Sequence, residues 1–329
     1  MADIWTDHGV LPYRSLVSSY KHLSAHPTQW KILFHFSNMR WNEIFANFHS
    51  HLMCGRKIRR RIEEFNPDVV VSVHPAMNVS PLRGVRKISK SIGKHIPFFT
   101  VVTDLGSAHR YWFQRDVDKL YVPTERLQKL AKKQGGTPDE NIIRIGLPIR
   151  HDFAVQAEKL GDRTTEEGKA YQKAVRKSLG VDPDHPMVLV MGGGEGVGSL
   201  SSIVNELYAK FTKLGVDASI YVVCGRNEKL KNDLANRDWD AVVKECEENK
   251  TKMHGRRRGH RSKKIDEAMQ HAEEHKDDPH PKGKVKVVGL GFVTNMAEYM
   301  VASDVLVSKA GPGTIAEAAS VGLPIMLTR

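Results

Sequence analysis

The sequence has few cysteines and no long apolar run. Its three cysteines, Cys54, Cys224 and Cys246, lie far apart without a CxxC pair, so neither a disulfide framework nor a zinc site is readable. The longest apolar run, Met187–Met191, is far shorter than the ~20 residues that cross a bilayer. The first residues resemble neither a secretory signal nor a transit peptide. We therefore expect a reducing compartment and no membrane span.

Acidic residues are also in deficit. Asp+Glu 38 against Lys+Arg 50 gives a net charge of +12, which favours nucleic acid, anionic lipid or phosphorylated substrates as partners. No nucleic-acid module is readable, so nucleic acid is not expected. Hydrophobic residues at 40% and charged residues at 27% are typical of a soluble globular protein, and 329 residues suffice for about two domains.

Short apolar runs alternate with helix-patterned segments, and the order βαβα occurs twice. Continuous apolar runs of this length are typical of strands covered on both faces, as in the parallel sheets of α/β proteins. The expected helices are Phe45–Phe65, Glu125–Gln134 and Ser199–Leu214. The expected strands are Val69–His74, Phe98–Asp104, Lys119–Pro123, Met187–Gly194, Ala218–Gly225, Val285–Gly291 and Asp304–Gly311.

Two charged stretches divide the chain. Residues 151–180 begin within LPIRHDF and include the charged, apolar-poor segment that follows it, which predicts a linker between an N-terminal domain at 1–150 and a C-terminal domain at 181–329. Residues 244–284 are rich in charge and histidine and contain few large apolar residues, so we expect a disordered insertion there.

A glycine-rich turn follows the strand that begins at Met187. Glycines without a Cβ let backbone N–H groups approach a phosphate, and a helix N-terminus adds partial positive charge. The candidate diphosphate ligands are Gly192, Gly193, Gly194, Glu195 and Gly196. The alternative is a structural turn whose glycines serve tight packing, since the pattern is neither a Walker loop nor a GxGxxG fingerprint.

A second such turn follows the strand at Asp304, and Glu317 lies one helical turn further on. Glu317 is either a favourable partner of the helix dipole or an acceptor for ribose hydroxyl groups. The turn contains Lys309, Gly311, Pro312, Gly313 and Thr314, and two such turns in one half are harder to explain by packing alone.

Two further segments follow strands at the edge where doubly wound sheets bind ligands. Arg226 could pair with a phosphate or be a solvated arginine. Gly291, Phe292 and Val293 could place backbone amides against a base, although a phenylalanine is more often core.

In the N-terminal half, His74 and Asp104 end neighbouring strands and are candidates for acid/base catalysis, although a lone histidine is more often structural. Arg110, Trp112 and Arg115 form an aromatic and basic loop that is typical of a membrane interface, while its aromatics could equally be core.

These segments together resemble the monogalactosyldiacylglycerol synthases of photosynthetic organisms and their bacterial diacylglycerol glucosyltransferase relatives. The resemblance runs collinearly from about Trp5 to the last residue. It is carried by SVHPAMNVSPLR, FFTVVTDLGSAHRYWF, IIRIGLPIRHDF, VLVMGGGEGVG, VVCGRN, GFVTNM and DVLVSKAGPGTIAEAASVGLPIML.

The resemblance implies a GT-B glycosyltransferase fold, with two Rossmann-like domains facing a cleft. It implies that the C-terminal domain holds UDP-galactose, with both glycine turns on the diphosphate, Glu317 on the ribose and Gly291–Val293 on the uracil. The expected reaction is inverting transfer of galactose to 1,2-diacylglycerol. No metal or cofactor is expected, and an anionic lipid is a candidate activator.

The resemblance also implies a peripheral protein of the chloroplast envelope membrane, with diacylglycerol and an anionic membrane surface as partners, and it leaves a homodimer open. Family members begin with a further strand and a histidine turn and continue past the last residue here, so we expect a chain truncated at both ends and of low activity. The alternatives are transfer from UDP-glucose or UDP-N-acetylglucosamine to another lipid, or a non-catalytic nucleotide- or lipid-binding fragment.

Overall fold

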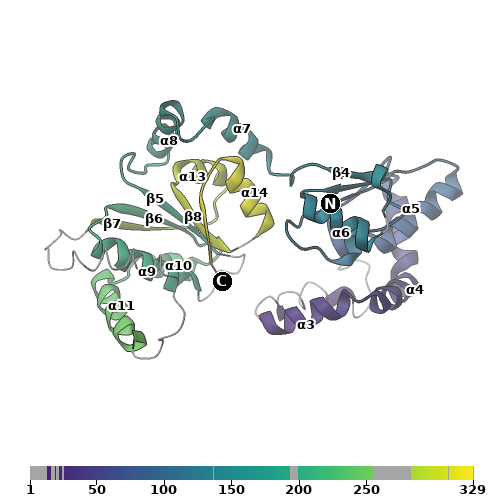
Figure 1. The fold of residues 1–329 in the computed structure, drawn as a ribbon, viewed down its shortest axis with the longest axis horizontal. Coiled ribbons are helices and arrows are strands. Elements are labelled where there is room, and N and C mark those ends of the chain that lie inside the picture. Colours follow the sequence, from purple (N-terminus) through teal and green to yellow (C-terminus); the bar gives the residue numbers. More distant parts are fainter. Residues whose placement is uncertain are drawn as a thin grey trace. The chain divides into compact units, whose positions relative to one another are not determined.

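The protein consists of two compact units, Met1–Pro148 and Ile149–Arg329, each built around its own parallel sheet (Figure 1). The computed structural model describes residues 13–15, 19, 22–23, 26–135, 137–192, 199–254, 283–309 and 311–328. Within those ranges, no helix combines the length and apolarity needed to cross a bilayer. The prediction of an α/β protein with two parallel sheets is confirmed.

The N-terminal unit alternates helices and strands. Its 3-10 helices are η1 (Tyr13–Ser15), η2 (Pro75–Met77), η3 (Arg110–Trp112) and η4 (Asp139–Asn141). Its α-helices are α3 (Pro27–Ser37), α4 (Arg40–Phe65), α5 (Val79–Ile92) and α6 (Glu125–Gln134). Its strands are β1 (Val70–Ser72), β2 (Phe98–Val101), β3 (Lys119–Val122) and β4 (Ile142–Arg144).

These four strands lie in the order β1-β2-β3-β4 and are all parallel. Phe98 and Leu120 are fully buried in the sheet, where they join one core with Ile58 of α4, Val85 of α5 and Leu127 of α6. Because parallel strands end at the same edge, the residues that follow β1 and β2 come together. That edge therefore receives both His74 and Asp104.

The C-terminal unit contains the second sheet. Its helices are α7 (His151–Leu160), α8 (Glu166–Ser178), α9 (Ser199–Lys213), α10 (Glu228–Ala235), α11 (Trp239–His254), α13 (Met296–Ala302) and α14 (Pro312–Ser320). Its strands are β5 (Met187–Met191), β6 (Ala218–Val223), β7 (Val285–Leu290), β8 (Val305–Lys309) and β9 (Ile325–Thr328).

The strand order is β7-β6-β5-β8-β9, and all pairs are parallel. Met187 and Leu189 of β5 pack into the core with α7, α8, α13 and α14. Val188 and Val190 pack into the core on the other face with α9 and α10. Both faces of β5 are therefore covered, which is why its sequence is continuously apolar.

The predicted linker at 151–180 is wrong. These residues contain α7 and α8, whose buried side chains Phe153, Leu160 and Val175 belong to the core of the C-terminal unit. Each helix is charged on its exposed face and carries a short apolar stripe, so its mean composition resembles that of a linker. The boundary between the two units lies at Pro148 and Ile149.

The predicted disordered insertion at 244–284 is wrong in its first part, since α11 continues to His254. Cys246 in that part is buried and packs with Val242 of the same helix and Ala209 of α9. Residues 255–282 lie outside the described part of the chain.

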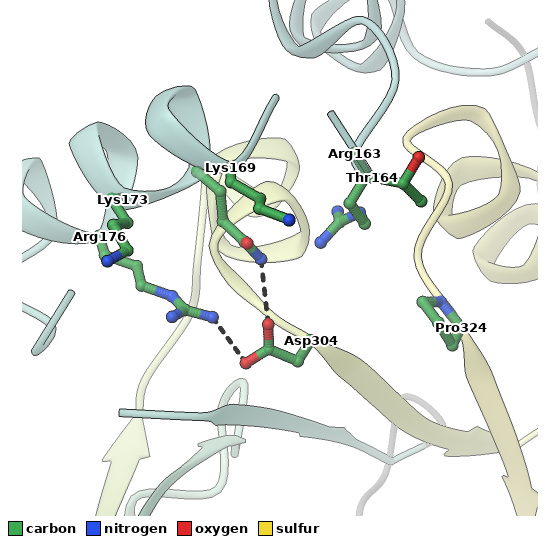
Figure 2. Close-up of a pocket in the computed structure, with 8 residues that line it drawn as sticks. Arg163, Thr164, Lys169, Lys173, Arg176, Asp304 and Pro324 are labelled. Atoms are coloured by element: carbon green, nitrogen blue, oxygen red, sulfur yellow. Dashed lines mark hydrogen bonds and ion pairs between the residues drawn. The ribbon is translucent and has the colours of Figure 1, made fainter. Parts of the chain in front are cut away.

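Helix α8 is held to the sheet by the buried side chains of Gln172 and Arg176, which both donate to Asp304. Figure 2 shows Arg176 beside Asp304. The Nε of Arg176 donates to the carbonyl of Ala302 at 2.7 Å, and its Nη2 donates to Asp304 Oδ2 at 2.6 Å. Arg163 donates to the carbonyls of Met300, Ser303 and Val321. These guanidinium groups thus satisfy carbonyls at the end of α13 that the helix itself leaves unpaired.

Replacing Arg176 with Met should lower the free energy of unfolding of the C-terminal unit by about 3 kcal/mol, because the carbonyl of Ala302 and the carboxylate of Asp304 each lose a buried charged donor. Urea denaturation followed by circular dichroism measures this loss. The matched control is Lys177→Met on the next, exposed position, which should change stability by less than about 0.5 kcal/mol. Equal midpoints for the two variants would contradict the structural role of Arg176.

Candidate functional site

The loops after four strands of the C-terminal unit share one edge of its sheet. Met191 at the end of β5 pairs with Ser308 of β8 and with Val223 of β6, so the residues that follow these strands are neighbours. The chain runs outward from β5 through β6 to β7 and then resumes on the other side at β8. Ligands of doubly wound sheets bind at such a reversal point.

Both predicted glycine turns begin at this reversal point. Gly192 follows β5 directly and is half-buried, whereas Gly193, Gly194, Glu195 and Gly196 lie outside the described residues. Lys309 ends β8 with an exposed side chain.

The glycines of the second turn are not required by the packing of the described chain. A Cβ at Gly311 would meet only Thr314 Oγ1, at 3.7 Å, and a Cβ at Gly313 would have no described neighbour within 4 Å. Neither glycine has a positive φ. Gly311 caps α14 without a side-chain hydrogen bond, and Pro312 opens the helix. The side-chain space at Gly313 is therefore open, at a helix N-terminus whose first N–H groups have no partner within the helix.

Glu317 lies in α14 and is engaged by Arg150 at the start of α7. The Nε and Nη2 of Arg150 donate to the two carboxylate oxygens at 2.7 and 3.0 Å. These hydrogen bonds to Glu317 raise the pKa of Arg150. The side chain of Glu317 is 13% exposed and that of Arg150 57% exposed, so the carboxylate is the fixed partner. Sequence reasoning missed Arg150, although it lies within the quoted GLPIRHDF segment.

The remaining predicted donor-site residues follow β6 and β7. Arg226 is exposed, and the next residue, Asn227, caps α10 through a hydrogen bond from the Leu230 N–H. Phe292 is 73% exposed, so the alternative that it is a core residue is wrong. Its neighbour Val293 packs on the core. A Cβ at Gly291 would make only ordinary contacts, at 3.6 Å, with the side chains of α10.

In the N-terminal unit, Asp104 is held by the indole of Trp112. The Nε1 of Trp112 donates to Asp104 Oδ2 at 2.8 Å. Burial raises the pKa of Asp104, while the hydrogen bond from Trp112 and the charge of His74 oppose that rise. His74 is exposed, and its Nδ1 accepts a hydrogen bond from the Ala76 N–H at 3.2 Å.

Asn78 joins the segments that carry these two candidates. It is fully buried, accepts a hydrogen bond from the Thr100 hydroxyl and donates to the carbonyl of Tyr111. It thereby connects the end of η2, strand β2 and η3. The residue was visible in the SVHPAMN segment, but nothing in the sequence indicated its partners.

The expected membrane loop is wrong at Trp112, which is 1% exposed and therefore a core residue. Arg115 is exposed, and Arg110 donates from Nη2 to the carbonyl of Gln134. The apolar surface lies elsewhere: half of the exposed large apolar side chains of the described residues lie between positions 30 and 53. We call them the α3–α4 apolar face: Trp30, Ile32, Leu33, Phe36, Met39, Trp41, Ile44, Phe45, Phe48, Leu52 and Met53.

Helix α3 is attached to the loop that contains the Asp104 site. His109 Nε2 lies 3.0 Å from the hydroxyl of Ser37, and the ring of Phe34 meets the His109 ring edge to face. Asn38 accepts a hydrogen bond from the backbone N–H of Arg110. Burial, with a smaller contribution from Arg110, lowers the pKa of His109 to about 4. The histidine is therefore a neutral structural residue at pH 7.

The chain is similar to known glycosyltransferases along both of its units. Residues 1–149 match the monogalactosyldiacylglycerol (MGDG) synthase family, and residues 240–328 match the glycosyltransferase family 28 C-terminal domain. Monogalactosyldiacylglycerol synthase 1 of Arabidopsis thaliana is 32% identical over 331 residues, covering 99% of this chain and 51% of that protein. The synthase of Spinacia oleracea is 32% identical over 332 residues, covering 99% of this chain and 52% of that protein.

The chain is a homologue of the monogalactosyldiacylglycerol synthases. It spans about half the length of the curated relatives it matches. The resemblance predicted from the sequence is confirmed, and the match to the family 28 domain together with the two parallel sheets confirms the GT-B fold class.

Solved structures similar to this synthase homologue include MurG of Acinetobacter baumannii, with 13% identity, a TM-score of 0.46 and coverage of 85% of this chain and 58% of that one. The UDP-GlcNAc 2-epimerase of Neisseria meningitidis bound to UDP-GlcNAc has 14% identity, a TM-score of 0.47 and coverage of 84% and 62%.

The lowered pKa of His109 predicts that its imidazole titrates near pH 4 in the folded protein rather than near 6.5. As the pH falls below 6.5, the unfolded chain takes up a proton that the folded chain does not, so folding stability falls between pH 6.5 and about 4. NMR titration of the histidine ring signals, assigned with a His109→Gln variant, measures the midpoint. A midpoint near 6.5 would contradict burial of the neutral ring against Ser37.

Proposed function

We propose that the chain transfers galactose from UDP-galactose to the sn-3 hydroxyl of 1,2-diacylglycerol with inversion. The observation that carries this proposal is the open, glycine-lined edge between β5 and β8, in a chain that is homologous to the synthases over 99% of its length.

The donor diphosphate would lie on the N-terminus of α14. The Cβ position of Gly313 faces open space there, Lys309 ends β8 and Arg226 follows β6, and both cationic side chains are exposed. Fixed donors of this kind stabilise the charge that develops on the departing UDP. Phe292 follows β7 and would cover the uracil with its exposed ring.

The ribose would bind Glu317. Because Arg150 occupies both carboxylate oxygens, the ribose hydroxyls must share the carboxylate with this guanidinium or displace it. Displacement would free a cation beside the diphosphate. In either arrangement Arg150 belongs to the proposed donor site. Its two hydrogen bonds to the carboxylate of Glu317 support this assignment.

Replacing Gly313 with Val should weaken UDP binding by at least about tenfold, because a branched side chain would fill the space that the diphosphate needs. The free protein should fold normally, since a Cβ at this position has no described neighbour within 4 Å. Calorimetry with UDP measures the affinity. The matched control is Ala319→Val, an exposed position of the same helix, and equal affinities for the two variants would disprove the diphosphate assignment.

Asp104 is the better candidate for the general base that takes the proton of the acceptor hydroxyl. Its raised pKa makes the carboxylate more basic than usual, and Trp112 fixes its orientation. The Nδ1 of His74 accepts the Ala76 N–H, which leaves the proton of the neutral ring on Nε2. Neutral His74 is therefore better placed to donate a hydrogen bond than to abstract a proton.

Asp104→Asn should lower galactosyl transfer by about 10²–10⁴-fold, because the amide cannot accept the hydroxyl proton. His74→Gln should have a much smaller effect. Radiolabelled lipid formed from diacylglycerol with UDP-galactose, UDP-glucose or UDP-N-acetylglucosamine measures both the base and the donor preference. Full activity of Asp104→Asn would exclude Asp104 as the base, and a preference for another donor would reject galactose.

We also propose that the protein docks peripherally on a membrane through the α3–α4 apolar face. This surface is attached through Ser37 and Asn38 to the loop that carries Asp104, which supports access of a lipid acceptor to that residue. The plant relatives are named as chloroplastic proteins. On that basis we propose that this protein is located in the chloroplast, at the envelope membrane. Formation of a homodimer stays a prediction, as does activity without a metal or cofactor.

A further inference from the structure

A basic cavity lies in the C-terminal unit, at the edge of the sheet where β8 and β9 begin (Figure 2). We propose that this cavity, called here the α8 pocket, binds the phosphate group of a small soluble phosphate monoester. Lys309 and the second glycine turn lie at the other end of β8, so the inference concerns a site separate from the proposed donor site. The α8 pocket has a volume of about 560 Å³ and is lined by Arg163, Thr164, Lys169, Gln172, Lys173, Arg176, Asp304 and Pro324.

The first support is an excess of positive charge. Four of the lining residues are cationic, and Asp304 alone among them is acidic. The carboxylate of Asp304 already accepts hydrogen bonds from Arg176 Nη2 at 2.6 Å and from the Met187 N–H at 2.7 Å. The hydrogen bonds of Arg163 in the described part of the chain all go to backbone carbonyls, so no carboxylate there pairs with its charge. Like charges around one cavity repel each other, and a bound anion would offset that repulsion.

The surroundings of Arg163 also disfavour its charged form. Burial lowers the pKa of Arg163, the charge of Asp304 opposes that fall, and the charge of Arg176 adds to it. A bound anion would stabilise the guanidinium in the same place.

The second support is the set of donors that the α8 pocket offers to a ligand. Arg163 has five N–H groups, and three of them donate to described carbonyls. The ammonium group of Lys169 has three N–H groups and one described partner, Glu166 at 2.8 Å. Figure 2 shows the side chains of Lys169 and Arg163 pointing toward one another. Phosphate oxygens form strong charge-assisted hydrogen bonds with both kinds of side chain.

The third support concerns the rest of the ligand. A cavity of about 560 Å³ is larger than a phosphate ion and is typical of small-molecule sites, which measure roughly 300–1,000 Å³. Of the described residues that line it, Pro324 alone has an apolar side chain. Acyl chains would find little apolar surface there, whereas polar side chains such as that of Thr164 suit hydroxyl groups. The ligand class is therefore a phosphorylated sugar or polyol rather than a phospholipid.

The test is calorimetry of the full chain with glucose 6-phosphate, inorganic phosphate and glucose. Glucose 6-phosphate should bind more tightly than inorganic phosphate, and glucose should not bind. Lys169→Ala should weaken glucose 6-phosphate binding by about tenfold, because one charge-assisted hydrogen bond is lost, and Lys169→Arg should retain binding. The matched control is Lys177→Ala, an exposed position of α8 outside the pocket, which should leave the affinity unchanged.

Gly313→Val separates this site from the proposed donor site. The variant should bind glucose 6-phosphate as the wild-type chain does, whatever its effect on UDP. Loss of glucose 6-phosphate binding in Gly313→Val would place the ligand at the glycine turns and overturn the inference.

Two further outcomes would reject the α8 pocket. One is equal affinity of Lys169→Ala and Lys177→Ala for glucose 6-phosphate. The other is binding of inorganic phosphate alone, or of neither phosphate, by the wild-type chain. Lys169 is an exposed residue, so Lys169→Ala should unfold at the same urea concentration as the wild-type chain, and circular dichroism checks this.

Discussion

The parallel pairing of β5 with β8 is the interaction on which the proposed donor site depends. The two strands are far apart in the sequence, yet their register places Gly192 and Lys309 at the same edge. The helices α7, α8, α13 and α14 cover one face of that pair of strands. Arg163, between α7 and α8, and Gln172 of α8 donate hydrogen bonds to carbonyls of α13, the helix that precedes β8. A ligand edge results because parallel strands present all their carboxyl ends, and the helix N-termini that follow, on one side.

The N-terminal unit uses buried polar contacts in a comparable way. Trp112 contributes its ring to the core and its N–H to Asp104, so the packing of one side chain positions a titratable group. His109 and Asn38 attach α3 to the same loop. The α3–α4 apolar face therefore belongs to the same unit as the candidate acceptor site.

Sequence patterns predicted seven of the nine strands in the described part of the chain, and they missed β4 and β9, two short strands at sheet edges. The sequence-based prediction failed where it depended on the average composition of a segment. Residues 151–180 are rich in charge, but Phe153, Leu160 and Val175 provide enough apolar surface to pack two helices on the sheet. The prediction of a membrane loop at Trp112 was wrong for a different reason. An aromatic side chain flanked by arginines is equally compatible with a core and with an interface.

The sequence by itself determined the α/β class, the positions of the glycine turns and the family, because each is carried by local runs of residues whose chemistry does not depend on distant partners. Tertiary structure decided which of these residues meet. The pairing of Arg150 with Glu317, the burial of Trp112 against Asp104, and the gathering of Arg163, Lys169 and Asp304 around one cavity each join segments that are separate in the chain. Such contacts follow from strand register and helix packing, which are set by the whole core and not by any one segment.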